Sequence, residues 1–165
     1  MKISKLVGKL AKTGIFIGSI GGIIYYNKKS FEKSGELLGR YKSYYQLANQ
    51  WLVNKNECKD IESYFENNDI HKVAIYGMGT LGDLIYNDLK NTKINVEYFI
   101  DKNADALYYG DDNIVVVGLD DIEKQEYVDA IIVTPIFDFE EIEKILSQKT
   151  KVEIKSLEDV IYGLQ

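Results

Sequence analysis

A glycine-rich turn is the part of this sequence best suited to chemistry. Gly77, Gly79 and Gly82 form a GxGxxG pattern between an apolar run and a segment of helical periodicity, and in that context the pattern binds dinucleotides. Gly77 would permit the tight turn, Gly79 would let a pyrophosphate approach the backbone, and Gly82 would let the helix pack close to the sheet. The amides of Thr80, Leu81 and Gly82 would lie at the positive end of the helix dipole, where they suit a phosphate.

An acid follows at the distance that such a site requires. Asp101 comes nineteen residues after Gly82, at the end of the second expected strand. A carboxylate there accepts hydrogen bonds from a ribose diol and favours NAD over NADP, a preference that Lys102 weakens. The sequence therefore predicts a nucleotide-type ligand, either NAD(P) or a sugar nucleotide. The alternative is a tight turn without a ligand, followed by an acid in a strand-end loop.

Thr134 is a further candidate for this site. It follows the fourth expected strand, together with Pro135 and Phe137. In the expected sheet, the crevice between the first and fourth strands is the switch point where ligands bind. Simple termination of the strand by Pro135 explains the same residues equally well.

No catalytic set accompanies the turn. Cys58 and His71 are each the only residue of their type. A disulfide within the chain is therefore excluded, no convincing nucleophile–base pair is visible, and no metal site is expected. The clustered acids at 120–123 and 140–143 resemble solvated helix starts. The sequence favours binding over catalysis.

Residues 71–165 alternate between strand and helix patterns. We expect strands at 72–76, 96–100, 114–117, 128–134 and 152–154. We expect helical segments at 80–89, 119–125, 138–147 and 156–162, with Asp138 and Ser156 as N-caps and Asp159 completing a capping box. Such alternation predicts an α/β fold with a small doubly wound parallel sheet of about five strands in the order 3-2-1-4-5.

Two helical segments precede this Rossmann-like domain. Residues 1–29 combine a basic amphipathic pattern with an uncharged, glycine-rich run at 13–26. The run is short for a helix that spans a bilayer, which needs about 20 residues. We therefore expect residues 1–26 to associate with a membrane, in preference to a complete span by residues 6–26. In lipid, the series Gly14, Gly18 and Gly22 would allow close helix approach in a homo-oligomer.

The segment 30–70 carries an apolar and aromatic stripe at helical spacing. The spacing predicts one helix over about 34–54 and a shorter one near 60–67. Packing against a neighbour explains such a stripe better than a stacking platform does.

The net charge of −6 is unevenly distributed. Residues 1–40 carry +6 and residues 41–165 carry −12. The acidic part would repel phosphates, which argues against a nucleic-acid partner. A single cysteine gives no sign of an oxidising compartment, so a cytoplasmic location is expected, with membrane association through the basic, glycine-rich segment.

The motifs together resemble a known group of modules. The pattern YGMGxxG at 76–82, the IDK at 100–102, the strand DAIIVTP at 129–135 and the closing SLEDVIYG at 156–163 resemble small NAD(P)-binding-like Rossmann modules of bacterial surface-polysaccharide and sugar-nucleotide enzymes. The resemblance implies that Gly77, Gly79, Gly82 and Asp101 line a nucleotide site. It also implies a partner such as a glycosyltransferase or a sugar-nucleotide enzyme.

Three functions follow from these expectations. The first is a non-catalytic nucleotide-binding module, accessory or regulatory in bacterial polysaccharide biosynthesis. The second is a small oxidoreductase or epimerase-like enzyme that needs a partner. The third is a membrane-tethered scaffold with an empty Rossmann site.

Overall fold

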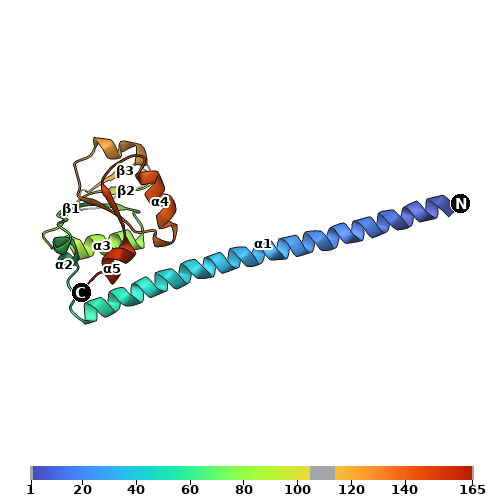
Figure 1. Cartoon of the computed structure of the whole chain (residues 1–165), viewed down its shortest axis with the longest axis horizontal. Coiled ribbons are helices and arrows are strands. Elements are labelled where there is room, and N and C mark those ends of the chain that lie inside the picture. The colour runs from blue at the N-terminus through green and yellow to red at the C-terminus, as the bar shows by residue number, and fades with distance from the viewer. Residues whose placement is uncertain (1, 105–113, 165) are drawn as a thin grey trace. The chain divides into compact units, whose positions relative to one another are not determined.

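Five short strands form one all-parallel sheet. They are β1 (Lys72–Tyr76), β2 (Asn95–Ile100), β3 (Val115–Val117), β4 (Ala130–Val133) and β5 (Glu153–Ser156). The strand order is β3-β2-β1-β4-β5, and every neighbouring pair is parallel. The predicted α/β fold and its strand order are thus confirmed (Figure 1). The order reverses between β1 and β4, so the switch point lies where β1 runs into the glycine turn.

The computed structural model describes residues 2–104 and 114–164, and for residues 2–26 it describes the backbone alone. The α-helices are α1 (Lys2–Asn56), α2 (Ile61–Asn67), α3 (Thr80–Leu89), α4 (Phe139–Leu146) and α5 (Leu157–Tyr162). Two 3₁₀ segments, η2 (Leu119–Lys124) and η3 (Ile136–Asp138), complete the described elements.

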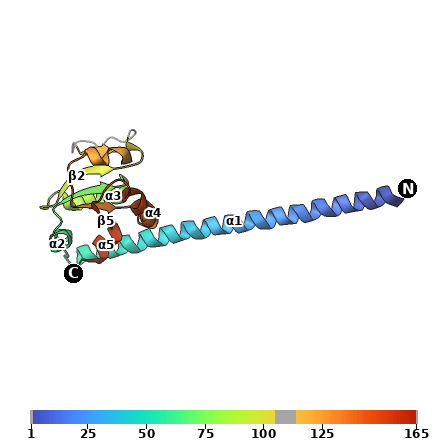
Figure 2. The ribbon, with the colours of Figure 1, turned by 45° about the horizontal axis from the view of Figure 1, so that its top comes forward.

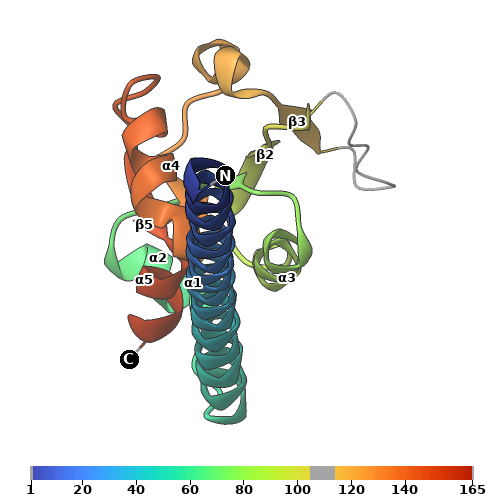
Figure 3. The ribbon, with the colours of Figure 1, turned by 90° about the vertical axis from the view of Figure 1, so that its right-hand side faces the viewer.

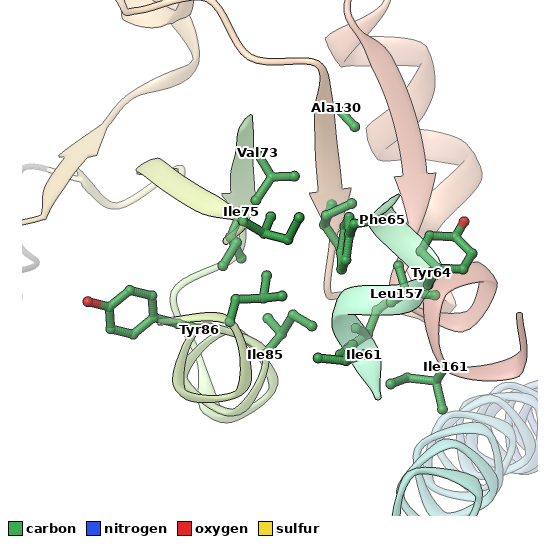
Figure 4. Close-up of a cluster of buried hydrophobic side chains, with 14 of the residues drawn as sticks. Ile61, Tyr64, Phe65, Val73, Ile75, Ile85, Tyr86, Ala130, Leu157 and Ile161 are labelled. Atoms are coloured by element: carbon green, nitrogen blue, oxygen red, sulfur yellow. The ribbon is translucent and has the colours of Figure 1, made fainter. Parts of the chain in front are cut away.

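Helices cover both faces of the sheet because its strands are apolar on both sides. Val73 and Ile75 of β1 face one cluster, and Ala74 and Tyr76 face the other. The first cluster is closed by α2, α3 and α5, whose side chains converge on β1 and β4 (Figure 4). The second is closed by α4 and η2, so that α3 and α4 lie on opposite sides of the sheet (Figure 3). Burial on two faces is typical of parallel sheets.

The last turns of α1 belong to the same compact unit as the sheet. The chain divides into Met1–Lys42 and Ser43–Gln165. In the second unit Leu47 and Trp51 are buried in the first cluster. The amide Nδ2 of the buried Asn54 donates to the carbonyl of Ile161 at 2.6 Å, so this end of α1 is tied to α5. The helices α2 and α5 contact each other nearby (Figure 2).

The helix boundaries differ from the sequence prediction in the N-terminal part. One helix, α1, covers residues 2–29 and 34–54 of the expected segments without a break. The division into compact units falls between Lys42 and Ser43. The pattern did not mark the helix ends, since no proline separates the two segments. Of the stripe expected to pack against a neighbour, Leu47 and Trp51 are buried, whereas Leu38, Tyr45 and Leu52 are exposed.

The helix caps were predicted with mixed success. Ser156 and Asp159 form the expected capping box at α5, with the Ser156 amide donating to Asp159 Oδ2 at 3.0 Å. Asp138 occupies the N-cap position of α4 but makes no side-chain capping hydrogen bond. The preceding 3₁₀ turn η3 gives Asp138 a backbone conformation outside the extended region typical of a capping residue.

No helix in the described part of the chain is long and apolar enough to cross a membrane. The side chains of the expected anchor, residues 1–26, and the glycine series Gly14, Gly18 and Gly22 lie outside the described ones.

Candidate functional site

Gly77 makes the turn that ends β1. Its φ is +96°, a backbone conformation that side chains other than hydrogen disfavour. Its amide donates to the carbonyl of Ile100 at 2.8 Å, which ties the turn to the end of β2. A Cβ atom at this position would lie 2.7 Å from Thr134 Oγ1. The fold itself therefore requires glycine here.

Gly82 allows α3 to approach the turn closely. A Cβ on Gly82 would lie 2.2 Å from the carbonyl oxygen of Gly77 and 3.5 Å from the ring of Phe99. The first contact is with backbone and cannot be relieved by rotating a side chain. Gly82, like Gly77, is thus explained by packing, with no ligand needed.

At position 79, by contrast, neither backbone conformation nor packing requires glycine. Gly79 is the N-cap of α3, with φ −116° and ψ −169°, which any residue adopts. A Cβ there would meet no atom within 4 Å. Gly79 borders instead a pocket of about 620 Å³, a volume within the range of about 300–1,000 Å³ found for small-molecule sites. Because Gly79 has no side chain, a ligand in this pocket could reach the backbone of the turn.

This pocket, the turn pocket, joins four parts of the fold. Its walls are the glycine turn with the start of α3, the end of β2, the loop after β4, and α1; the lining residues are Tyr44, Ala48, Gly77, Met78, Gly79, Thr80, Leu81, Leu84, Asp101, Thr134 and Pro135. All seven residues predicted for the site line this pocket or, in the case of Gly82, lie directly behind its wall.

The start of α3 offers backbone donors to the turn pocket. The first α-helical hydrogen bond of α3 runs from the Asp83 amide to the Gly79 carbonyl, at 2.9 Å. The amides of Thr80, Leu81 and Gly82 precede it, and a helix has no internal acceptors for its first amides. Gly79 has no side chain that could cap them. The partial positive charge at this end of α3 therefore suits an anionic group such as a phosphate.

Asp101 braces the turn as well as facing the pocket. Its Oδ2 accepts from the Met78 amide at 3.0 Å, and its Oδ1 accepts from the Asn103 amide at 2.8 Å. The Asp101 amide in turn donates to the Val117 carbonyl at 3.0 Å. The carboxylate is half-buried, and each oxygen has a second lone pair that can accept a further hydrogen bond.

Thr134 is mainly a structural residue. It is buried, and its hydroxyl lies 3.0 Å from the carbonyl oxygen of Tyr76 and 3.2 Å from that of Gly77. A hydroxyl has one proton to donate, and here it is donated to these two backbone carbonyls. Thr134 therefore holds the β1 end against the β4 end while its surface forms part of the pocket wall.

A second pocket of about 430 Å³ lies beyond the turn. It shares Gly77, Asp101 and Pro135 with the turn pocket and is otherwise lined by Tyr76, Lys102, Leu119, Asp138, Glu141, Ile142 and Ile145. Burial, together with the nearby Asp101 and Glu141 carboxylates, raises the pKa of the Tyr76 hydroxyl above its usual value. The two pockets form adjoining spaces on either side of the switch point, as an elongated ligand would need.

Several lining residues were not predicted from the sequence. Tyr44 and Ala48 come from α1, and only their membership of the aromatic and apolar helical stripe hinted at a role. Tyr76 was part of the expected first strand without a role of its own. Within residues 2–104 and 114–164, no group of three or more His, Cys, Asp or Glu side chains could hold a metal ion.

The comparisons with known proteins give one match. A family model described as C2185-like, N-terminal matches residues 69–157, more than half of the chain. The chain belongs to this family. The matched region of the C2185-like N-terminal family runs from just before β1 to the start of α5, so it includes the glycine turn, Asp101 and Thr134. No curated protein and no solved structure matches the chain.

Proposed function

We propose that this chain is a non-catalytic nucleotide-binding module that holds NAD(P) or a sugar nucleotide at the glycine turn. The observation that carries the proposal is Gly79: packing explains Gly77 and Gly82, whereas the space in front of Gly79 is open and faces the turn pocket. A diphosphate in that space would reach the amides of Thr80 and Leu81 at the start of α3. Its ribose would lie toward the remaining lone pairs of Asp101.

The role that we propose for the module is accessory or regulatory, in bacterial surface-polysaccharide biosynthesis. Its support is the resemblance of the glycine turn, the IDK segment and the DAIIVTP strand to modules of that kind. A glycosyltransferase or sugar-nucleotide enzyme would then be its partner. We further propose that residues 1–26 tether it to the inner face of the membrane.

Calorimetric titration of the full chain with NAD⁺, NADP⁺ and UDP-glucose tests the proposal. The informative variant is Gly79→Ser, because serine is a good N-cap and its Cβ meets no protein atom, so that α3 keeps its stability. Its side chain would occupy the space that the diphosphate needs. We expect at least a tenfold loss of affinity, equal to about 1.4 kcal/mol.

Gly118→Ser is the matched control. Gly118 is also an N-cap glycine in extended conformation, and its Cβ position is open too, but it borders η2 outside the turn pocket. It should bind as the wild type does. Equal affinity in the wild type and Gly79→Ser would contradict the proposed site. Absence of heat with every nucleotide would favour the empty scaffold, and turnover of an added nucleotide would favour the enzyme.

A further inference from the structure

A row of large apolar side chains on α1 is exposed to solvent. In the first compact unit Phe31 and Leu38 are 82% and 70% exposed, and in the second unit Tyr45 and Leu52 are 71% and 63% exposed. These four residues, named here the heptad stripe, follow one another at intervals of seven along one helix. Exposed apolar side chains grouped in this way mark an interaction surface.

The stripe is distinct from the face of α1 that packs on the sheet. Leu47, Trp51 and Asn54 make that contact and are buried. At 100° per residue, Tyr45 and Leu52 lie more than a quarter of a turn away from Leu47. The second unit therefore leaves the stripe open while its own core is complete.

Charge is absent from the four members of the stripe, and of the positions three residues after them one, Lys55, is charged. Three residues after each of the first three members stand Ser34, Tyr41 and Ala48, none of them charged. Two pairs of charged side chains lie elsewhere on this stretch of the helix, Lys28 with Glu32 and Arg40 with Glu36. A spacing of seven with large apolar side chains at every a position is a feature of coiled coils. An isolated straight helix has a period of 3.6 and does not need a seven-residue repeat.

We propose that two copies of this chain pair through the heptad stripe as a parallel coiled coil. A second copy supplies the partner that the pattern requires, namely a helix with the same seven-residue period. Residues 27–38 are all exposed, and helices in proteins owe most of their stability to packing. Leu10, Ile17 and Ile24 continue the interval toward the N-terminus.

The flanking charges favour the parallel orientation. A parallel pair brings the g positions of one helix beside the e positions of the other. The g positions Ser30, Leu37, Tyr44 and Trp51 carry no charge, so Lys28 and Lys42 at e positions meet no lysine. An antiparallel pair would bring e positions together, with Lys28 beside the partner's Lys42 or Lys28. Ala48 belongs both to a d position and to the wall of the turn pocket, which places the second helix beside that pocket.

Disulfide crosslinking of the full chain tests the pairing. In a Cys58→Ser background, which removes the single exposed cysteine, Leu38→Cys and Tyr45→Cys should each give a crosslinked dimer under mild oxidation. Lys29→Cys, on an exposed position away from the stripe, is the matched control and should remain monomeric. Crosslinking of all three variants alike, or of none, would overturn the proposal.

Sedimentation of the full chain in a mild detergent gives an independent readout. The wild type should have twice the mass of the monomer, and the double variant Leu38→Lys/Tyr45→Lys should have the mass of one chain with unchanged thermal unfolding of the sheet domain. The experiment is run at about 50 μM chain, on the order of the dissociation constant of a weak coiled coil. A wild type that sediments as a monomer at this concentration would overturn the pairing. A second outcome would also overturn it. If lipid vesicles protect the Leu38→Cys thiol from a water-soluble thiol reagent and no crosslink forms, lipid and not a second helix covers the stripe.

Discussion

Asp101 is the residue whose chemistry decides the type of nucleotide. Its carboxylate already binds the Met78 and Asn103 amides, so any ribose would share it. Asp101→Asn keeps one acceptor oxygen and removes the charge. We expect affinity for NAD⁺ to fall about tenfold and affinity for NADP⁺ to fall less, because a 2′-phosphate is no longer repelled.

The measurement is a pair of calorimetric titrations with NAD⁺ and NADP⁺. Glu123→Gln, which removes an exposed charge on η2, serves as the control for a change in net charge and should alter neither affinity. An equal fall in both affinities for Asp101→Asn would mean that Asp101 acts only by bracing the turn.

Asp129 is a second acid with a defined task, away from the site. Its Oδ2 accepts from the amides of His71 and Lys72 at 2.9 and 2.8 Å. The hydrogen bonds from these amides lower the pKa of the Asp129 carboxyl from its ordinary 3.8. A lowered folded-state pKa means that this stabilisation is complete well above pH 4 and is lost as the pH falls through the folded-state value.

The variant Asp129→Asn therefore has a pH-dependent cost. At pH 7 we expect it to reduce the free energy of unfolding by about 1 kcal/mol, since hydrogen bonds to charged groups are stronger. The difference from the wild type should shrink as the pH is lowered below 4. Urea unfolding at several pH values, followed by the fluorescence of Trp51, measures it; a constant difference from pH 7 to pH 3 would contradict the assignment.

At the scale of elements, the turn between β1 and α3 sets the distance between helix and sheet. Gly82→Ala would force a Cβ to 2.2 Å from the Gly77 carbonyl oxygen. We expect it to destabilise the fold by roughly 2–4 kcal/mol, as overpacking against backbone does. Gly118→Ala, whose Cβ position is open, should change stability far less. Urea midpoints of the two variants compare them directly, and equal midpoints would show that α3 can shift away.

Much of this arrangement could be predicted from local patterns. The glycine spacing, the apolar runs of β1 and β4 and the acid after β2 are short-range signals, and they located the turn and the strand order. The strand ends differ from the prediction: β4 covers Ala130–Val133 rather than 128–134, because hydrogen bonds to β1 and β5 decide where a strand ends. The presence of Tyr44 and Ala48 in the wall of the turn pocket depends on how α1 packs against an element about 30 residues away, which no local pattern encodes.

At the scale of the whole molecule, the charge division is the feature open to test. The basic segment 1–40 would approach anionic lipid, while the acidic remainder would be repelled by it. We expect the full chain to sediment with vesicles containing phosphatidylserine and to be released when Lys2, Lys5, Lys9 and Lys12 are replaced by glutamine. Recovery of the wild type entirely in the supernatant would contradict a tether formed by residues 1–26.

The central claim is that the turn binds a nucleotide through its backbone. The most direct measurement is an amide NMR titration of the ¹⁵N-labelled full chain with NAD⁺, NADP⁺ and UDP-glucose. We predict that one of them shifts the amide signals of Met78 to Gly82, together with that of Asp101, and leaves those of α2 unchanged. Millimolar concentrations of all three that shift none of these signals, or that shift only signals far from the turn, would contradict it.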